Sequence, residues 1–142
     1  MTCFWDGILT SLKFTGNAQL ETISNRFDLI KYFKEIGSEP TDELIDDICN
    51  VAINNEKLSK QQVTETIDAI KNFNIDSIYF GYYCSTCDPF LILFAALSKC
   101  TIQHKYVNNL ITYKFEITNN IAKNIVLRFE SNSSHFWFQS HF

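Results

Sequence analysis

Residues 88–106, DPFLILFAALSKCTIQHKY, decide the fold because the spacing of apolar residues changes within them. Asp88 followed by Pro89 is typical of a helix start, since an aspartate caps free N–H groups and proline fits the first helical position. The apolar run that follows predicts a buried helix. From Cys100 to Val107 the pattern instead favours a strand. The stretch therefore marks the change from a helical part of the chain to a β part.

The chain before this stretch is predicted to be helical, because apolar residues recur at spacings of three and four. Ser59 and Gln62 match a capping box, and Gly37 is placed to end a helix. Thr2 is the expected cap of the first helix. The predicted helices cover residues 3–13, 18–37, a segment that starts at 40–42, and 60–73. In the second of them, the expected inward face comprises Leu20, Ile23, Phe27 and Ile30.

The chain after this stretch is predicted to form strands, because apolar and polar residues alternate. The clearest case has an apolar face made of Ile111, Tyr113, Phe115 and Ile117. In the last strand the same rule places His135, Trp137, Gln139 and His141 on one face and Phe136, Phe138 and Phe142 on the other. The predicted strands cover residues 100–107, 111–117, 124–130 and 135–142. Helices followed by a small, mainly antiparallel sheet make an α+β fold, and 142 residues fit a single domain, 1–142.

The composition excludes several classes of partner. The net charge of -4 argues against nucleic acid, since binding phosphates needs clustered Lys and Arg. No apolar run reaches the length of a membrane span, so we expect no membrane partner. No basic region precedes an apolar one near the start, so we expect no signal peptide. The 5 cysteines, an odd number, then favour free thiols in a reducing compartment, the cytoplasm.

Cys3 is the first candidate for chemistry. It opens a predicted helix, where the macrodipole and the free N–H groups favour the thiolate, the nucleophilic form. A nucleophilic cysteine also needs an imidazole that takes its proton. His135 is the candidate, because it opens a strand after a polar loop. The alternative is that Cys3 is a small structural residue at the end of a helix.

Cys84 and Cys87 form a second candidate through their C-x-x-C spacing. A zinc site needs four ligands, usually from two such pairs, and only Cys49, Cys100 and the histidines are left to complete it. A redox pair needs a preceding strand and a βαβ context, which the sequence matches only in the following helix. We therefore expect two reduced cysteines in an aromatic loop, and no metal. His104 is expected to be a half-exposed sheet residue.

The order of these parts resembles the ovarian-tumour (OTU) family of papain-like cysteine proteases, many of which cleave ubiquitin chains. Residues 3–12, CFWDGILTSL, are similar to the family's nucleophile segment, a cysteine and an aromatic residue before an apolar helix. Residues 83–106, YCSTCDPFLILFAALSKCTIQHKY, are similar to its aromatic loop, helix and following strand. Residues 124–138, NIVLRFESNSSHFWF, are similar to its closing strand, polar loop and histidine followed by an aromatic residue.

The resemblance implies a papain-like arrangement in which Cys3 is the nucleophile and His135 the general base. It also implies ubiquitin or another protein as the substrate, and no cofactor. Three features depart from the family, and one is the tryptophan of its loop, which is absent at residues 82–86, YYCST. The family's acidic segment before the cysteine has no counterpart in the two residues that precede Cys3, and Trp137 stands where the family has an Asn or Asp that orients the histidine. Gln139, further along the same face, is then the candidate orienting residue.

The same departures favour an alternative function. The chain would then be a catalytically degenerate OTU-like module with a binding or structural role, for instance in the particle of a large DNA virus. The exposed face of residues 135–142 would be a protein contact. In both cases the expected location is the cytoplasm, which means the host cytoplasm or the virion if the protein is viral.

Overall fold

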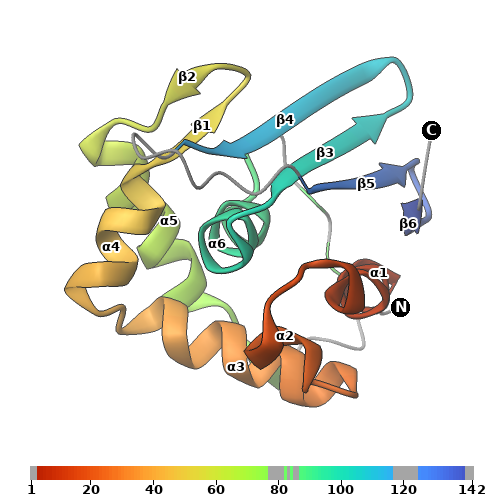
Figure 1. Ribbon diagram of the computed structural model, residues 1–142, viewed down its shortest axis with the longest axis horizontal. Helices are drawn as coiled ribbons and strands as arrows, with labels where there is room; N and C mark the ends of the chain where they lie inside the picture. Colours follow the sequence, from red (N-terminus) through yellow and green to blue (C-terminus); the bar gives the residue numbers. More distant parts are fainter. Residues whose placement is uncertain (1–2, 77–81, 83, 85–86, 117–124, 140–142) are drawn as a thin grey trace.

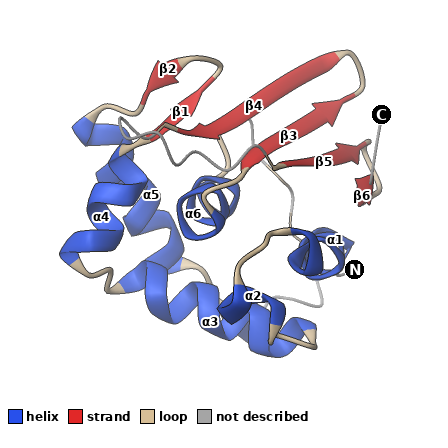
Figure 2. Cartoon of the chain, in the orientation of Figure 1, coloured by secondary structure: helices blue, strands red, loops and turns tan. Residues whose placement is uncertain are grey.

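The computed structural model describes residues 3–76, 82, 84, 87–116 and 125–139. Most helices gather on one side of the molecule and the strands on the other (Figure 1 and Figure 2). The helices are α1 (Cys3–Ser11), α2 (Ala18–Glu21), α3 (Arg26–Ser38), α4 (Asp42–Cys49), α5 (Lys60–Asn72) and α6 (Pro89–Ser98), with a 3-10 turn η1 (Leu12–Phe14) after α1. The predictions for Thr2, Ile117, His141 and Phe142 concern residues outside the described part of the chain.

The described strands form one mixed sheet with the order β2-β1-β4-β3-β5-β6. They are β1 (Val51–Ile53), β2 (Glu56–Lys57), β3 (Thr101–Tyr106), β4 (Asn109–Phe115), β5 (Val126–Ser131) and β6 (Phe136–Gln139). β3 and β5 pair in parallel, and the other neighbouring pairs are antiparallel. The α+β class is confirmed. The sheet is larger and more mixed than the sequence pattern predicted.

The hairpin of β1 and β2 is the part of the sheet that the periodicity missed. Asn54 and Asn55 connect the two strands with φ angles of 50° and 72°, as in a tight hairpin turn that asparagine tolerates. The strands have 3 and 2 residues, too few for an alternation to be recognised. β1 pairs with β4, so the sheet continues into the helical half of the chain.

Two helix starts follow the rules that predicted them. The Asp88 side chain accepts hydrogen bonds from the N–H groups of Phe90 and Leu91, and proline follows as the first residue of α6. Ser59 and Gln62 form both bonds of a capping box at the start of α5. Each cap satisfies N–H groups that a helix leaves free at its first turn, which fixes where the helix begins.

The segment 18–37 forms two helices rather than the single one predicted. Asn25 caps α3 by accepting a hydrogen bond from the N–H of Asp28, and after this break Phe27 is 54% exposed instead of inward. Gly37 also does not end a helix. It is buried inside α3, where an added Cβ would lie 2.9 Å from a methyl group of Ile70. This glycine therefore permits close packing of α3 against α5.

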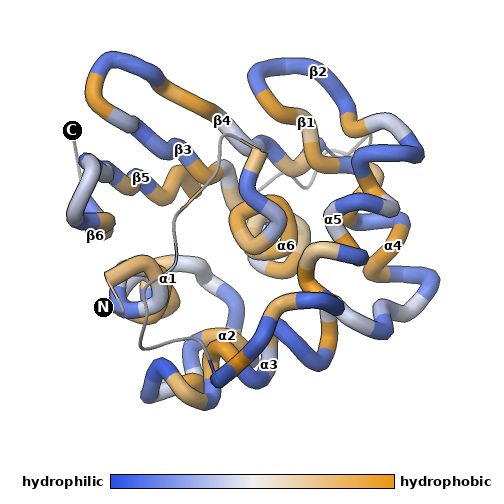
Figure 3. Tube along the Cα trace, turned by 180° about the vertical axis from the view of Figure 1, so that it is seen from behind, coloured by the Kyte–Doolittle hydropathy of each residue, from blue (hydrophilic) through white to orange (hydrophobic). Residues whose placement is uncertain are grey.

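The centre of the core is α6. All its residues are buried except Pro89 and Leu97, and Figure 3 shows it coloured as strongly hydrophobic. The helices α3, α4 and α5 contact it, as do the strands β1, β3 and β4. A helix that is apolar on all sides must be enclosed, so α6 organises the elements around it. Among the described helices, none has both the length and the apolar character needed to cross a membrane.

Candidate active site

The helix α1 and the strand β6 lie side by side (Figure 1). The Phe4 ring lies 4.8 Å from the Phe136 ring, and the Phe14 ring, in the turn η1 that follows α1, lies 5.4 Å from the Phe138 ring. Gly7 lies between these contacts, where an added Cβ would be 3.0 Å from the Phe136 ring. The contacts advance along both segments in the same direction. The N-terminal ends of α1 and β6 therefore lie together.

This register brings Cys3 and His135 to one end of the α1–β6 pair. Cys3 is the first residue of α1 and is a half-buried free thiol. His135 directly precedes β6 and is exposed. Its N–H donates to Asn132 Oδ1 at 2.9 Å, and its C=O accepts from the Asn132 N–H at 2.9 Å. Among the hydrogen bonds of the described residues, none joins the thiol to the His135 ring.

In the described part of the structure, the position of His135 is fixed by hydrogen bonds of its backbone rather than of its side chain. Gln139 is paired with Arg128 at the other end of β6, roughly 13 Å along the strand from His135, so its role as the orienting residue gains no support. Trp137 is 38% exposed. Asn132, which the sequence reasoning missed, holds the His135 backbone in the turn between β5 and β6. Its place in a polar Ser–Asn–Ser–Ser loop is the signal, because asparagine often bonds the backbone of turns.

A second thiol and imidazole are in contact elsewhere in the fold. Cys84 Sγ lies 3.7 Å from His104 Nδ1, and Nε2 of the same ring lies 2.6 Å from Ser131 Oγ. His104 is 2% exposed, so the expectation of a half-exposed residue is wrong. The signal for its burial was present in the sequence, since the alternation in β3 places His104 on the same face as the buried Ile102.

The Asp88 side chain joins this contact to the start of α6. Its carboxylate is 0% exposed and accepts the Tyr82 hydroxyl at 2.7 Å. It also accepts the N–H groups of Phe90 and Leu91 at 2.9 and 3.3 Å, and it helps to raise the pKa of the nearby Cys84 thiol. These donors compensate a buried carboxylate, which would otherwise carry a large desolvation cost.

Burial governs protonation in this cluster. It lowers the pKa of His104 to about 4, so the ring is neutral near pH 7. Burial, reinforced by the Asp88 carboxylate, raises the pKa of both the Cys84 thiol and the Tyr82 hydroxyl. Burial also raises the pKa of Tyr113, whose hydroxyl accepts the Asp88 N–H at 3.1 Å. The cluster around Asp88 therefore contains a neutral imidazole, a protonated thiol and two protonated phenols, of which Tyr82 contacts the carboxylate.

These protonation states give the His104 ring one donor nitrogen and one acceptor nitrogen. One ring nitrogen faces the Cys84 sulfur and the other faces the Ser131 hydroxyl, and both partners can donate or accept, so the ring is held at both nitrogens in either tautomer. We call Ser131, His104, Cys84, Asp88 and Tyr82 the buried polar chain. A protonated thiol beside a neutral imidazole is a poor nucleophile, so the chain is structural rather than a second active site.

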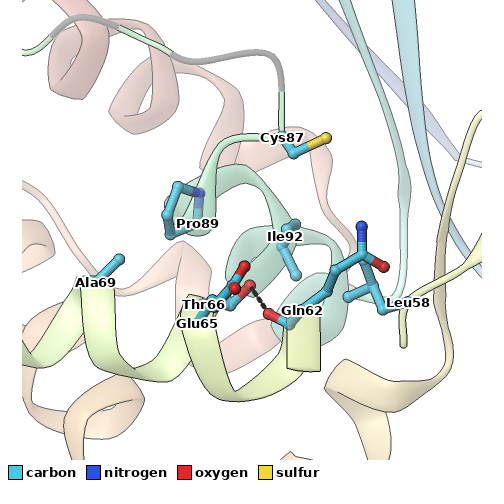
Figure 4. A pocket seen from close by; sticks show the side chains of 8 residues that line it. All are labelled: Leu58, Gln62, Glu65, Thr66, Ala69, Cys87, Pro89 and Ile92. Atoms are coloured by element: carbon cyan, nitrogen blue, oxygen red, sulfur yellow. Dashed lines mark hydrogen bonds between the residues drawn. The ribbon is translucent and has the colours of Figure 1, made fainter. Parts of the chain in front are cut away.

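Cys87 lies apart from these groups. It is exposed at an open pocket of about 260 Å³ between α5 and α6 (Figure 4). The pocket is lined by Leu58, Gln62, Glu65, Thr66, Ala69, Cys87, Pro89 and Ile92. Neither Cys3 nor His135 lines it. Within the part of the chain that the structure describes, no group of three or more His, Cys, Asp or Glu residues is arranged to hold a metal ion. The C-x-x-C motif thus gains no zinc ligand set there.

Comparisons of the chain with protein-family models, with curated proteins and with solved structures gave no match. The likeness to the OTU family therefore rests on the three sequence stretches that carry it. The function has to be argued from the geometry of α1 and β6 and from the residues at their shared end.

Proposed function

We propose that the protein is an OTU-like cysteine protease, a deubiquitinase, in which Cys3 is the nucleophile and His135 the general base. The observation that supports this most is the common direction of α1 and β6, which starts the helix that carries Cys3 beside the strand that follows His135. A papain-like site requires this meeting of a helix start with a histidine from the sheet. The two residues stand near opposite ends of the 142-residue sequence, and the fold brings their elements together.

The chemistry follows from the two side chains. The His135 imidazole takes the thiol proton of Cys3, and the thiolate attacks the carbonyl carbon of the bond to be cut. Free N–H groups in the first turn of α1 would stabilise the negative oxygen of the tetrahedral intermediate. The imidazolium then protonates the leaving amine, and the C–N bond breaks. Water, deprotonated by the imidazole, hydrolyses the thioester and restores both groups.

The remaining geometry fits a pair that forms when substrate binds. Cys3 is half-buried and the His135 side chain is exposed, while the turn that carries the histidine is fixed through Asn132. Because Phe136 and Phe138 face the N-terminal segment, the His135 ring has to turn towards α1 at the residue before β6 to meet the thiol. Catalytic hydrogen bonds are often long before a substrate is bound, so an unformed bond agrees with this proposal.

A ubiquitin-derived suicide probe tests the proposal. Cys3 should become covalently labelled, Cys3→Ala should abolish the adduct, and His135→Ala should slow labelling by about a hundredfold. Cys49→Ala is the matched control, because Cys49 is an exposed thiol at the end of α4 and its loss should change nothing. Absence of an adduct on folded wild-type protein, or an adduct on another cysteine, would contradict the proposal.

A second candidate function is a degenerate OTU-like module that binds a protein. Trp137 favours it, because a side chain that is 38% exposed stands where the family carries an orienting residue, on a strand next to the exposed His135. Exposed tryptophan is typical of protein contacts. The module would act in the cytoplasm of a host or in a virus particle. Turnover of a ubiquitin substrate that is lost in His135→Ala would reject this candidate.

A further inference from the structure

We infer that the buried polar chain positions Cys3 and His135, with Tyr82, Cys84 and His104 as positioning residues. The inference rests on the proposed function. It starts from two ring contacts at the ends of the chain. Tyr82 lies 4.6 Å from the ring of Phe4, the residue after Cys3, and His104 lies 5.4 Å from the ring of Phe136, the residue after His135.

Phe4 and Phe136, the neighbours of Cys3 and His135, therefore both pack against members of the buried polar chain. Phe4 and Phe136 are 1% and 6% exposed and lie 4.8 Å apart between ring centres. Tyr82 packs against Phe4, and its hydroxyl donates to Asp88 Oδ2 at 2.7 Å. His104 packs against Phe136, and its Nε2 lies 2.6 Å from Ser131 Oγ. Cys84 closes the link, since its sulfur lies 3.7 Å from His104 and its thiol is close enough to the Asp88 carboxylate for that charge to raise its pKa.

The chain can hold these rings in one place because His104 is bonded at both ring nitrogens and Tyr82 is bonded at its hydroxyl. A turn of the His104 ring would break the contacts to Cys84 and Ser131 together and leave buried polar atoms unpaired. Purely apolar packing would allow several nearly equal ring positions, whereas a fully satisfied polar network specifies one. A small shift between α1 and β6 matters here, because the thiol and the imidazole must meet within hydrogen-bond distance.

The surroundings of Cys84 favour a role in connecting Asp88 with His104 over a role as a reactive thiol. The Cys84 thiol is half-buried, has its pKa raised by burial and by the Asp88 carboxylate, and faces a neutral imidazole, so it lacks the positive surroundings that make a cysteine nucleophilic. The chain also spans separate elements: Ser131 ends β5, His104 lies in β3 and Asp88 caps α6. This connection between strand β3 and the cap of α6 fixes the positions of α1 and β6.

The test measures the rate at which iodoacetamide alkylates Cys3, resolved by peptide mass spectrometry, in the full chain. Cys84→Ala removes the link, and Cys84→Ser keeps a donor and an acceptor at the same position. Cys3 should react roughly tenfold more slowly in Cys84→Ala than in the wild type, and within about threefold of the wild type in Cys84→Ser. Alkylation of the exposed Cys49 in the same samples is the internal reference and should stay constant.

A double-mutant cycle with His135→Ala separates positioning from general loosening of the fold. If Cys84 acts through the Cys3–His135 pair, Cys84→Ala should have little further effect once His135 is gone. An equal slowing in both backgrounds would overturn the inference and leave the proposed function intact. Wild-type reactivity in a folded Cys84→Ala variant would do the same. If His135→Ala alone leaves Cys3 alkylation unchanged, the proposed function fails, and the inference falls with it.

Should Cys84→Ala fail to fold, Ser131→Ala provides the second arm. It removes only the hydroxyl at the end of the buried polar chain and leaves His104 Nε2 without this partner. Ser131 is half-buried and ends β5. The same cycle with His135→Ala then applies, and a Cys3 alkylation rate equal to that of the wild type would overturn the inference. Circular dichroism and the thermal midpoint establish that each variant is folded before alkylation is measured.

Discussion

At the scale of single residues, Asp88 connects the local start of a helix to the tertiary structure. Its Oδ1 caps α6 and its Oδ2 accepts from Tyr82, while its backbone N–H donates to Tyr113 in β4. The cap was predictable from an aspartate before a proline. The other contacts were not, because they join residues far apart in the sequence that only the folded sheet and loop bring together.

Replacing Asp88 with alanine should lower the free energy of unfolding by about 2–4 kcal/mol, because it removes a helix cap and leaves buried donors unpaired. Denaturant unfolding followed by circular dichroism measures the change. Asp68→Ala is the control, since Asp68 is exposed on α5 and should shift stability by no more than about 0.5 kcal/mol. Equal stability of the two variants would contradict the role given to Asp88.

At the scale of elements, the periodicity of apolar residues predicted the long, regular helices and strands. It missed the features that depend on contacts between elements. The helices α5 and α6 and the strands β3 and β4 follow their apolar patterns and caps. The break at Asn25 was missed because the helical spacing of apolar residues continues through it, although the asparagine is a good cap. The parallel pairing of β3 with β5 also carries no local signal, since it depends on which edge of β3 is left free.

The contact between α1 and β6 depends on the missing side chain of Gly7. Gly7→Val should displace the Phe136 ring, because even a Cβ would lie 3.0 Å from it. We expect a loss of about 1–3 kcal/mol in unfolding free energy from overpacking, together with roughly tenfold slower labelling of Cys3 by the ubiquitin probe.

Thr10→Val is the matched control for this prediction, because it introduces the same residue at an exposed position of the same helix. Labelling rates and unfolding curves should then stay close to those of the wild type. If Gly7→Val instead labels as fast as Thr10→Val and is equally stable, α1 and β6 do not need their close approach.

At the scale of the whole molecule, the buried His104 ring makes stability depend on pH. Its pKa is lowered by burial from 6.5 to about 4 in the folded protein, so the unfolded chain binds the proton first as the pH falls. The contribution is fully present above about pH 6.5, is lost between there and about pH 4, and changes no further below that. The loss should amount to on the order of 3 kcal/mol.

Unfolding free energies measured between pH 7 and pH 4 check this dependence. His104→Gln should give a smaller loss over that range than the wild type, because glutamine does not titrate. A His104→Gln variant with an unchanged slope would show that other groups govern the acid sensitivity.

The candidate site also belongs to the scale of the whole molecule, because its two residues come from the first and the last described elements. The sequence predicted Cys3 at a helix start and His135 before a strand, from the helix pattern and the alternation around them. It did not predict their register, which depends on how the aromatic rings of α1 and β6 pack. Nor did it predict the buried polar chain, whose members lie in β3, β5, the start of α6 and the residues before it.

Turnover of ubiquitin joined through its C-terminus to a fluorogenic amine tests the pairing of Cys3 with His135 most directly. Wild-type protein should release the dye, and Cys3→Ser and His135→Ala should each lower kcat/KM by about a hundredfold or more, while Cys49→Ser keeps the wild-type value. No release by folded wild-type protein, or full release by Cys3→Ser, would contradict a Cys3–His135 protease.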